Sequence, residues 1–169
     1  GHRSDAARRL AAHLFRESEF AKGVEALESF FEKDEAGLIR YVHETGAGAA
    51  GHLFRTDATK PRAEKLGGEV ISFLDERLPV NLSADKAKGR ARDVLGRIAG
   101  VHKTLDRDKQ VIVAYERMGK ILGMDDGILA EIASWHKNRK RMDQARVVYG
   151  RYADKVNGRR AVAGSFREE

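Results

Sequence analysis

The chain has 169 residues, 41% of them hydrophobic and 34% charged, with two prolines and no cysteine. This composition predicts a single folded domain with an apolar core, and it excludes disulfides and thiolate metal sites. The net charge of +6 is uneven, because residues 1–80 contain 12 Lys/Arg and 14 Asp/Glu whereas residues 81–169 contain 20 and 12.

Apolar residues at three- and four-residue spacing predict helices along most of the chain. The first would cover residues 4–31, starting from a cap at Ser4 and bending near Ser18 or Gly23. A shorter helical stripe follows at residues 38–42. The Gly/Ala run at residues 46–51 is expected to be a loop or a helix end.

The two prolines mark the limits of the next predicted helix. Pro61 suits its first turn, and the helix should stop before Pro79. Ser83 is the expected cap of the helix after that. Residues 105–108 are polar and predict either a turn or a polar patch on a continuing helix.

The C-terminal part contains a clear turn at residues 123–127, followed by a cap at Asp125 or Asp126. One long final helix should then run from about residue 128 and fray near residue 157. The chain is therefore predicted to be all-α, with five or six helices in an elongated antiparallel bundle of about four main helices plus short ones. The expected division is a bundle over 1–158 and a basic, flexible tail over 159–169.

The sharpest motif is G-x-G-x-x-G at residues 46–51, which follows an apolar stretch and precedes Asp75 by about the spacing of a dinucleotide-binding fingerprint. Against this interpretation, Pro61 would fall within the phosphate-binding helix, and no β-α alternation surrounds the motif. An interhelical loop is the favoured interpretation, and a nucleotide-dependent enzyme is kept as a third hypothesis.

Other signs of catalysis are weak. Residues 83–86 match S-x-x-K, but the companion motifs of serine acyl enzymes are missing. The six histidines have no metal-ligand spacing, and paired carboxylates sit where capping explains them. We therefore predict no catalytic residue, cofactor or metal site, and no enzymatic activity.

Positive charge peaks at residues 136–160, with nine basic and two acidic residues. On the predicted helix Lys137, Lys140 and Arg141 would be neighbours. Lysines and arginines on one surface attract an acidic protein face or the nucleic-acid phosphate backbone. The candidate binding residues are Lys137, Arg139, Lys140, Arg141, Arg146, Arg151, Lys155, Arg159 and Arg160.

The order of these features resembles the BID (Bep intracellular delivery) domain of type IV secretion substrates, which include effectors and conjugative relaxases. The resemblance rests on a helical segment before the glycine turn at residues 46–51, on the segment 62–66 with Val70 and Leu74, and on the basic C-terminal region. It implies an elongated four-helix bundle with charged patches, which acts as a recognition signal for the secretion apparatus and has no catalytic residues.

The leading hypothesis is a non-enzymatic interaction module that presents basic patches to an acidic partner, such as a type IV secretion apparatus. The alternative is a helical nucleic-acid-binding accessory domain that uses the basic helix at residues 136–160. No apolar run approaches the roughly 20 residues of a membrane span, and no small-molecule substrate is indicated. The expected location is the cytoplasm, with translocation by a secretion system as a further option.

Overall fold

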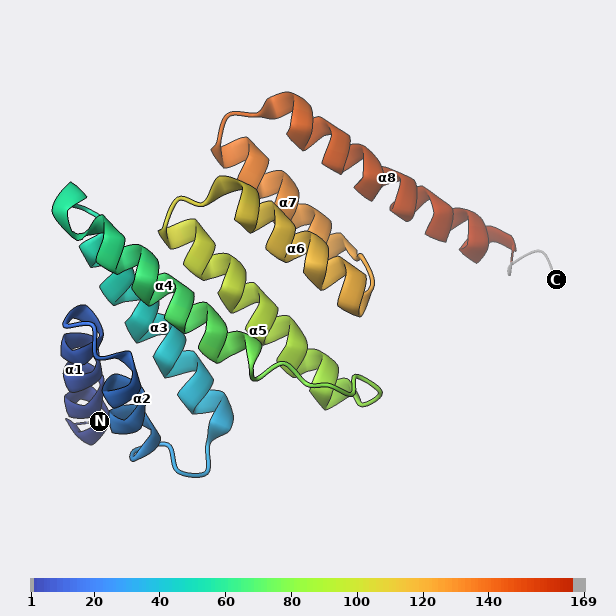
Figure 1. Ribbon diagram of the computed structural model, residues 1–169. Coiled ribbons are helices and arrows are strands. Elements are labelled where there is room, and N and C mark those ends of the chain that lie inside the picture. The colour runs from blue at the N-terminus through green and yellow to red at the C-terminus, as the bar shows by residue number, and fades with distance from the viewer. Residues whose placement is uncertain (1, 166–169) are drawn as a thin grey trace. The chain divides into compact units, whose positions relative to one another are not determined.

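The computed structural model describes residues 2–165, and the side chains of residues 2–154. Within that range it contains eight α-helices, one short 3-10 helix and no strand, which confirms the all-α prediction (Figure 1). The helices are α1 (His2–Arg16), α2 (Phe20–Glu28), α3 (Glu35–Leu53), η1 (Asp57–Thr59), α4 (Lys60–Asp75), α5 (Asp85–Thr104), α6 (Asp108–Leu122), α7 (Asp126–Asn138) and α8 (Met142–Ser165).

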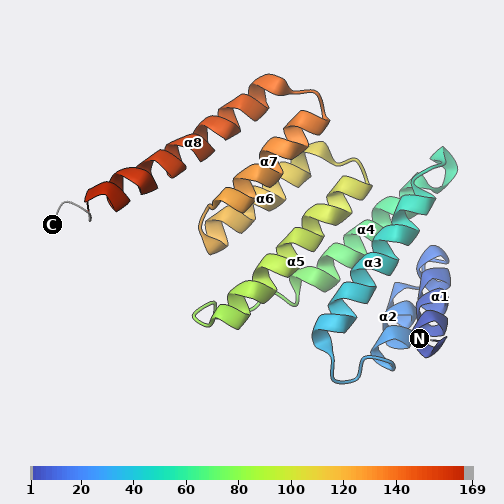
Figure 2. The same ribbon diagram turned by 180° about the vertical axis from the view of Figure 1, so that it is seen from behind.

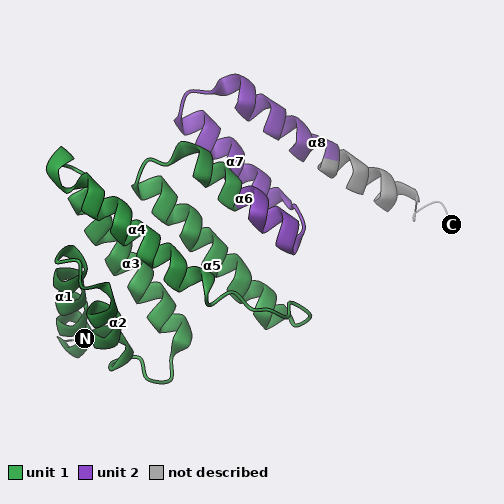
Figure 3. Cartoon of the chain, in the orientation of Figure 1, with its two compact units in different colours: residues 1–114 green, residues 115–169 purple. Residues whose placement is uncertain are grey.

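The chain forms two compact units, and the boundary between them falls within α6 (Figure 3). The first unit comprises residues 1–114 and the second residues 115–169. In the first unit α3 contacts both α4 and α5. Helix α4 runs antiparallel to each of the other two, and α3 and α5 run in the same direction (Figures 1 and 2). Fully buried side chains such as Ile39, Val42, Val70, Leu74 and Leu95 fill the space between them.

The predicted bend in the first helix is confirmed at Ser18, where the chain breaks into α1 and α2. Ser18 has a positive φ of 62°, and the backbone N–H groups of Ser18 and Glu19 donate to the carbonyls of Phe15 and Leu14. This pair of hydrogen bonds is the Schellman motif that commonly closes a helix. The break lets Phe20 stack on Phe15 with ring centroids 5.1 Å apart. The predicted cap at Ser4 is wrong, because α1 begins at His2.

The expected loop at residues 46–51 is also wrong, because the Gly/Ala run lies inside α3. The reason is close packing between helices. A Cβ atom at Gly46 would lie 2.5 Å from Cγ2 of Val70, and one at Gly51 would lie 3.0 Å from Cγ2 of Thr104. Glycine is unfavourable within a helix, but here it lets α4 and α5 approach the backbone of α3.

The proline predictions are confirmed at both ends of α4. Pro61 lies in its first turn, and the helix ends at Asp75, before Pro79. The predicted cap at Ser83 is wrong by one residue: Ala84 precedes the first residue of α5 and makes no side-chain cap hydrogen bond. Of the two alternatives for residues 105–108, the turn is confirmed and the continuing helix is wrong, because Asp106 adopts a φ of 55° in a second Schellman motif.

In the second unit the predicted turn and cap are confirmed. Gly123 has a φ of +85°, which favours glycine, and the carboxylate of Asp125 accepts the backbone N–H of Ile128 at 2.9 Å. Helix α7 packs against α8 through buried residues that include Ala145 and Val148.

The prediction of a single long final helix is wrong, because the helix is interrupted between Asn138 and Met142 and the chain forms α7 and α8. Lys140 has a φ of 58°. Its N–H donates to the carbonyl of Lys137 at 2.9 Å, and the N–H of Arg141 donates to that of His136 at 2.9 Å. These bonds form a third Schellman motif. Helix α8 then continues to Ser165, so it covers the first residues of the segment assigned to a tail.

Candidate functional site

The connection between α7 and α8 places four of the predicted basic residues close together in the chain. Lys137 lies in the last turn of α7, and Arg139 is its C-cap. Lys140 and Arg141 follow in the connection before α8 begins. Lys137, Arg139 and Lys140 are exposed, whereas Arg141 is half-buried. We call these four residues the basic connection.

Packing on Trp135 holds part of the basic connection in place. The guanidinium carbon of Arg139 lies 4.4 Å from the centroid of the Trp135 ring, within the range of a cation–π contact. The N–H of Arg139 also donates to the carbonyls of Trp135 and His136, both at 3.1 Å. Lys137 and Lys140 form no ion pair with any residue that the structure describes. Their two ammonium groups therefore remain available to an acidic partner.

The other predicted residues do not join the basic connection into one stripe. Arg146 pairs with Asp143 at 3.3 Å, and Arg151 pairs with Glu116 at 3.4 Å. Both pairs are exposed, so each contributes little to stability but lowers the local excess of charge. The side chains of Lys155, Arg159 and Arg160 lie outside the described residues. Because the chain turns at Lys140, the predicted helical neighbourhood of Lys137, Lys140 and Arg141 is wrong.

The glycine motif does not form a phosphate-binding loop. In a dinucleotide site the glycines precede a helix, so that free backbone N–H groups at its first turn face the pyrophosphate. Here the motif lies in the C-terminal half of α3, whose N-terminus is at Glu35, and the N–H of Gly37 donates to the carboxylate of Asp34 at 2.9 Å. Asp75, the residue at the spacing of the dinucleotide-binding fingerprint, is the last residue of α4. The fingerprint interpretation is therefore wrong.

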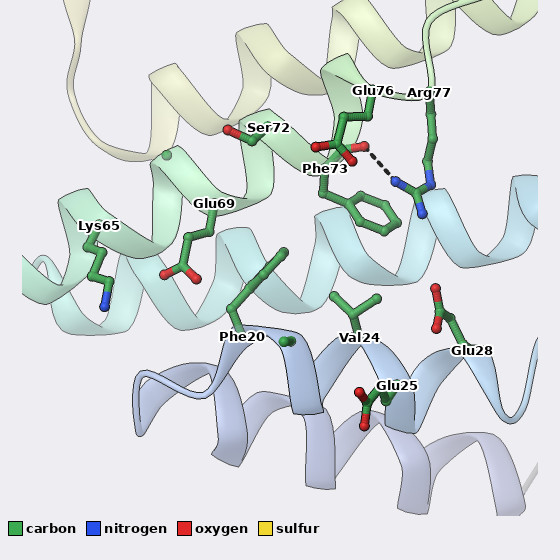
Figure 4. Close-up of a pocket in the computed structure, with 12 residues that line it drawn as sticks. Phe20, Val24, Glu25, Glu28, Lys65, Glu69, Ser72, Phe73, Glu76 and Arg77 are labelled. Atoms are coloured by element: carbon green, nitrogen blue, oxygen red, sulfur yellow. Dashed lines mark hydrogen bonds between the residues drawn. The ribbon is translucent and has the colours of Figure 1, made fainter.

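Sequence reasoning missed a groove between α2 and α4 (Figure 4). Phe20 and Val24 from α2 face Phe73 from α4 and form its apolar floor. Four glutamates line its sides, namely Glu25, Glu28, Glu69 and Glu76. The groove has a volume of about 620 Å³. Its residues come from two parts of the chain that are more than thirty positions apart, so no local pattern in the sequence indicates it.

One of the two positively charged side chains in this groove, Arg77, already contacts a neighbouring residue. Arg77 donates from Nη1 to the carbonyl of Phe73 at 2.9 Å, and its guanidinium carbon lies 3.5 Å from the Phe73 ring centroid. Lys65 is the other cation in the lining. Four glutamates against two cations leave the groove with a negative excess. It therefore suits an apolar side chain that is flanked by lysine or arginine.

No protein-family model, curated protein or solved structure matches this chain. Among the described residues, none of the helices combines the length and the apolar character that a bilayer crossing requires.

Proposed function

We propose that this chain is a non-enzymatic interaction module that binds an acidic partner through the basic connection between α7 and α8. The observation that carries the proposal is the exposure of Lys137 and Lys140, which pair with no carboxylate among the described residues. Unpaired cations at a helix end attract negative charge over about 8–10 Å at moderate ionic strength. Arg139, held on Trp135, adds a cation whose position is restricted by packing.

The proposal is tested by charge reversal with a matched control. The variant K137E/K140E removes two unpaired cations, and K86E/K88E reverses two exposed lysines on α5. The probe is a fluorescent oligoglutamate peptide, titrated by anisotropy at low and moderate salt. We expect K137E/K140E to weaken binding by about tenfold and K86E/K88E to leave it nearly unchanged. Equal losses in the two variants would show general charge attraction and would overturn the proposal.

A duplex DNA probe in the same experiment separates the alternative function, a nucleic-acid-binding accessory domain. Phosphate contacts make the binding constant fall steeply with salt, by about one power of salt concentration for each phosphate that is neutralised. If duplex DNA binds more tightly than the peptide and K137E/K140E lowers the salt dependence, the basic connection contacts nucleic acid. Failure of duplex DNA to bind at low salt would instead remove the alternative.

The resemblance to BID domains supports a more specific form of the proposal, in which the acidic partner belongs to a type IV secretion apparatus. The test is a reporter enzyme fused to this chain in bacteria that carry such an apparatus. We expect transfer of the reporter to recipient cells, and loss of that transfer with K137E/K140E. Absence of transfer in several apparatus types would overturn this form of the proposal and leave the binding experiment unaffected.

A second candidate function is the capture of a basic amphipathic helix in the groove between α2 and α4. The apolar floor of Phe20, Val24 and Phe73, with glutamates beside it, favours this occupant through charge complementarity. A helical peptide with leucines at i, i+3 and i+7 and lysines between them is the probe. Glu69→Lys should weaken its binding, and Glu17→Lys, at an exposed position just after α1, should not. Equal affinity of the two variants would exclude the groove as the binding site.

A further inference from the structure

A second groove in the first unit lies between α1 and α3 and is lined by arginines. Arg8, Arg9 and Arg16 contribute from α1, and Arg55 contributes from the segment just after α3. The groove has a volume of about 430 Å³. On a helix of 3.6 residues per turn, the three positions on α1 fall within about 100° of one another. One face of α1 therefore directs three guanidinium groups towards α3.

These arginines have no acidic partners within the described residues. None of the four forms an ion pair there, and the only aromatic contact among them joins Arg8 to the Tyr41 ring at 5.8 Å. The groove also contains His52 and a single carboxylate, that of Glu44. Four guanidinium groups and one carboxylate leave an excess of three positive charges when the histidine is neutral. Concentrated charge of one sign destabilises a folded chain, and a bound anion relieves the repulsion.

The floor of the groove offers space beside Gly48 and lies next to a buried hydroxyl group without a partner. Gly48 lies in the lining, and a Cβ atom there would meet no other atom within 4 Å. Thr45, one turn earlier on α3, also lines the groove and is only 5% exposed. Its Oγ1 has no hydrogen-bond partner among the described residues. A buried hydroxyl without a partner lowers stability, and its oxygen is not open to the groove, so a ligand would meet the arginines and the space beside Gly48.

From this arrangement we propose that the groove between α1 and α3 binds a small anion carrying two or three linked phosphates. Guanidinium groups match phosphate oxygens through paired N–H donors, and several of them together favour a ligand with several phosphates. The charge of a di- or triphosphate near neutral pH, about −3 to −4, matches the excess of three positive charges. The volume lies within the range of small-molecule sites.

Nothing in this site depends on the basic connection, since every lining residue belongs to the first unit. The site therefore extends the proposed function and can fail independently of it. It also assigns a role to the glycine motif. Gly46 and Gly51 allow helix packing, whereas Gly48 keeps the floor of the groove open.

The test is calorimetric titration of the full chain with pyrophosphate, tripolyphosphate and ATP at low salt, with sulfate as a single-anion comparison. Gly48→Leu fills the floor without changing any charge, and R9E/R16E reverses two of the lining cations. The matched control is Arg62→Glu, which reverses an exposed arginine on α4 outside the groove. Circular dichroism and urea unfolding verify that each variant remains folded.

We expect at least one of the three phosphates to bind more tightly than sulfate. Gly48→Leu and R9E/R16E should each weaken that binding by at least about tenfold, and Arg62→Glu should not. Thr45→Val should shift the urea midpoint upward, because it removes a buried polar group without a partner. Preference for ATP over tripolyphosphate would identify a nucleotide, and equal binding an inorganic oligophosphate.

Several results would overturn the proposal. One is the absence of binding by any of the three phosphates at millimolar concentration. Another is unchanged binding in Gly48→Leu, which would show attraction to the surface charge without occupation of the groove. A third is binding of a short single-stranded oligonucleotide that R9E/R16E abolishes while the small phosphates do not bind. That result would assign the arginines to a polynucleotide surface.

Discussion

His43 should make the stability of the first unit depend on pH. Its half-buried ring lies between α3 and α5, where Nη1 of Arg97 is 3.1 Å from Nδ1. A guanidinium group can only donate, so Nδ1 accepts and the ring proton is on Nε2. Burial lowers the pKa of His43 to about 4, and the positive charge of Arg97 acts in the same direction, against smaller opposite effects of Glu44 and Asp93.

The size of the effect follows from the difference in pKa between the folded and unfolded states. The unfolded chain binds a proton at His43 near its ordinary pKa of 6.5, whereas the folded chain binds it only near about 4. Stability is therefore complete above pH 6.5 and falls as the pH decreases towards 4, because the unfolded state takes up more protons. At about pH 5 this difference corresponds to about 2 kcal/mol, and solvent screening at a half-buried site lowers it to about 1–2 kcal/mol.

The assay is urea unfolding followed by circular dichroism at several pH values between 7 and about 5, on the wild type and on His43→Gln. The amide of Gln accepts a hydrogen bond from Arg97 and does not titrate in this range. We expect the free energy of unfolding of the wild type to fall as the pH decreases, and the fall to be smaller by about 1–2 kcal/mol in His43→Gln. His102, whose pKa is also lowered by burial and by Arg107, contributes in both proteins and leaves a residual slope.

A second measurement covers the case in which His43→Gln does not fold. The ring protons of His43 in the wild type can be titrated by nuclear magnetic resonance, and the midpoint reports its pKa directly. A midpoint near 6.5 would refute the reasoning, because the folded and unfolded states would then bind the proton equally. Identical pH dependence of unfolding in the wild type and a folded His43→Gln variant would refute it as well.

Three further predictions concern the helices. Gly46→Ala should destabilise the chain by about 1–3 kcal/mol, because its methyl group would overlap Val70 of α4. Gly48→Ala faces open space and should stabilise the chain by up to about 1 kcal/mol. Urea unfolding compares the two variants, and equal effects would contradict the packing argument. Lys140→Gly should stabilise the chain by about 0.5–1 kcal/mol, because Lys140 has a positive φ that favours glycine. Lys137→Gly, within α7, should destabilise the chain by about the same amount. Loss of stability in both variants would indicate a continuous helix. Asp125→Ala should lower the stability of the chain by about 1 kcal/mol, because it removes the cap of α7. Asp125→Asn should keep most of that stability, because asparagine is also a good cap, and thermal unfolding measures both variants. Equal losses of stability in the two variants would exclude the side-chain cap.

Local signals in the sequence predicted those features that depend on one residue and its neighbours. Pro61 has a restricted φ and no N–H, so its place in the first turn of α4 needs no knowledge of the rest of the fold. The cap at Asp125 after the turn at Gly123 is equally local. The groove between α2 and α4, in contrast, exists only because two separate helices come together, and its glutamates look like ordinary surface residues in the sequence.

The sequence alone favours a loop for the glycine run at residues 46–51, because glycine has two opposite uses in helical proteins. Its backbone freedom ends helices, and its small size lets helices approach one another. These two uses can be distinguished only by the residue that packs against the glycine. For Gly46 that residue is Val70, 24 positions away in the sequence. The low helix propensity of three glycines is offset by burial of the apolar residues of α3, including Val42, Ala49 and Ala50.

The break between α7 and α8 shows why a periodic pattern can hide the end of a helix. Within the described part of the chain, three helices end in Schellman motifs. Their residues of positive φ are Ser18, Asp106 and Lys140, and none of these is glycine. Polar, turn-forming neighbours indicated the first two, but lysine is a good helix former, so nothing local marked the third. A continuous helix would bring Lys137, Lys140 and Arg141 together on one face, where like charges repel. The turn at Lys140 removes that helical neighbourhood and lets α8 pack against α7, where Ala145 and Val148 are buried. The same charge that predicts a binding surface is therefore also a physical reason for the helix to end there.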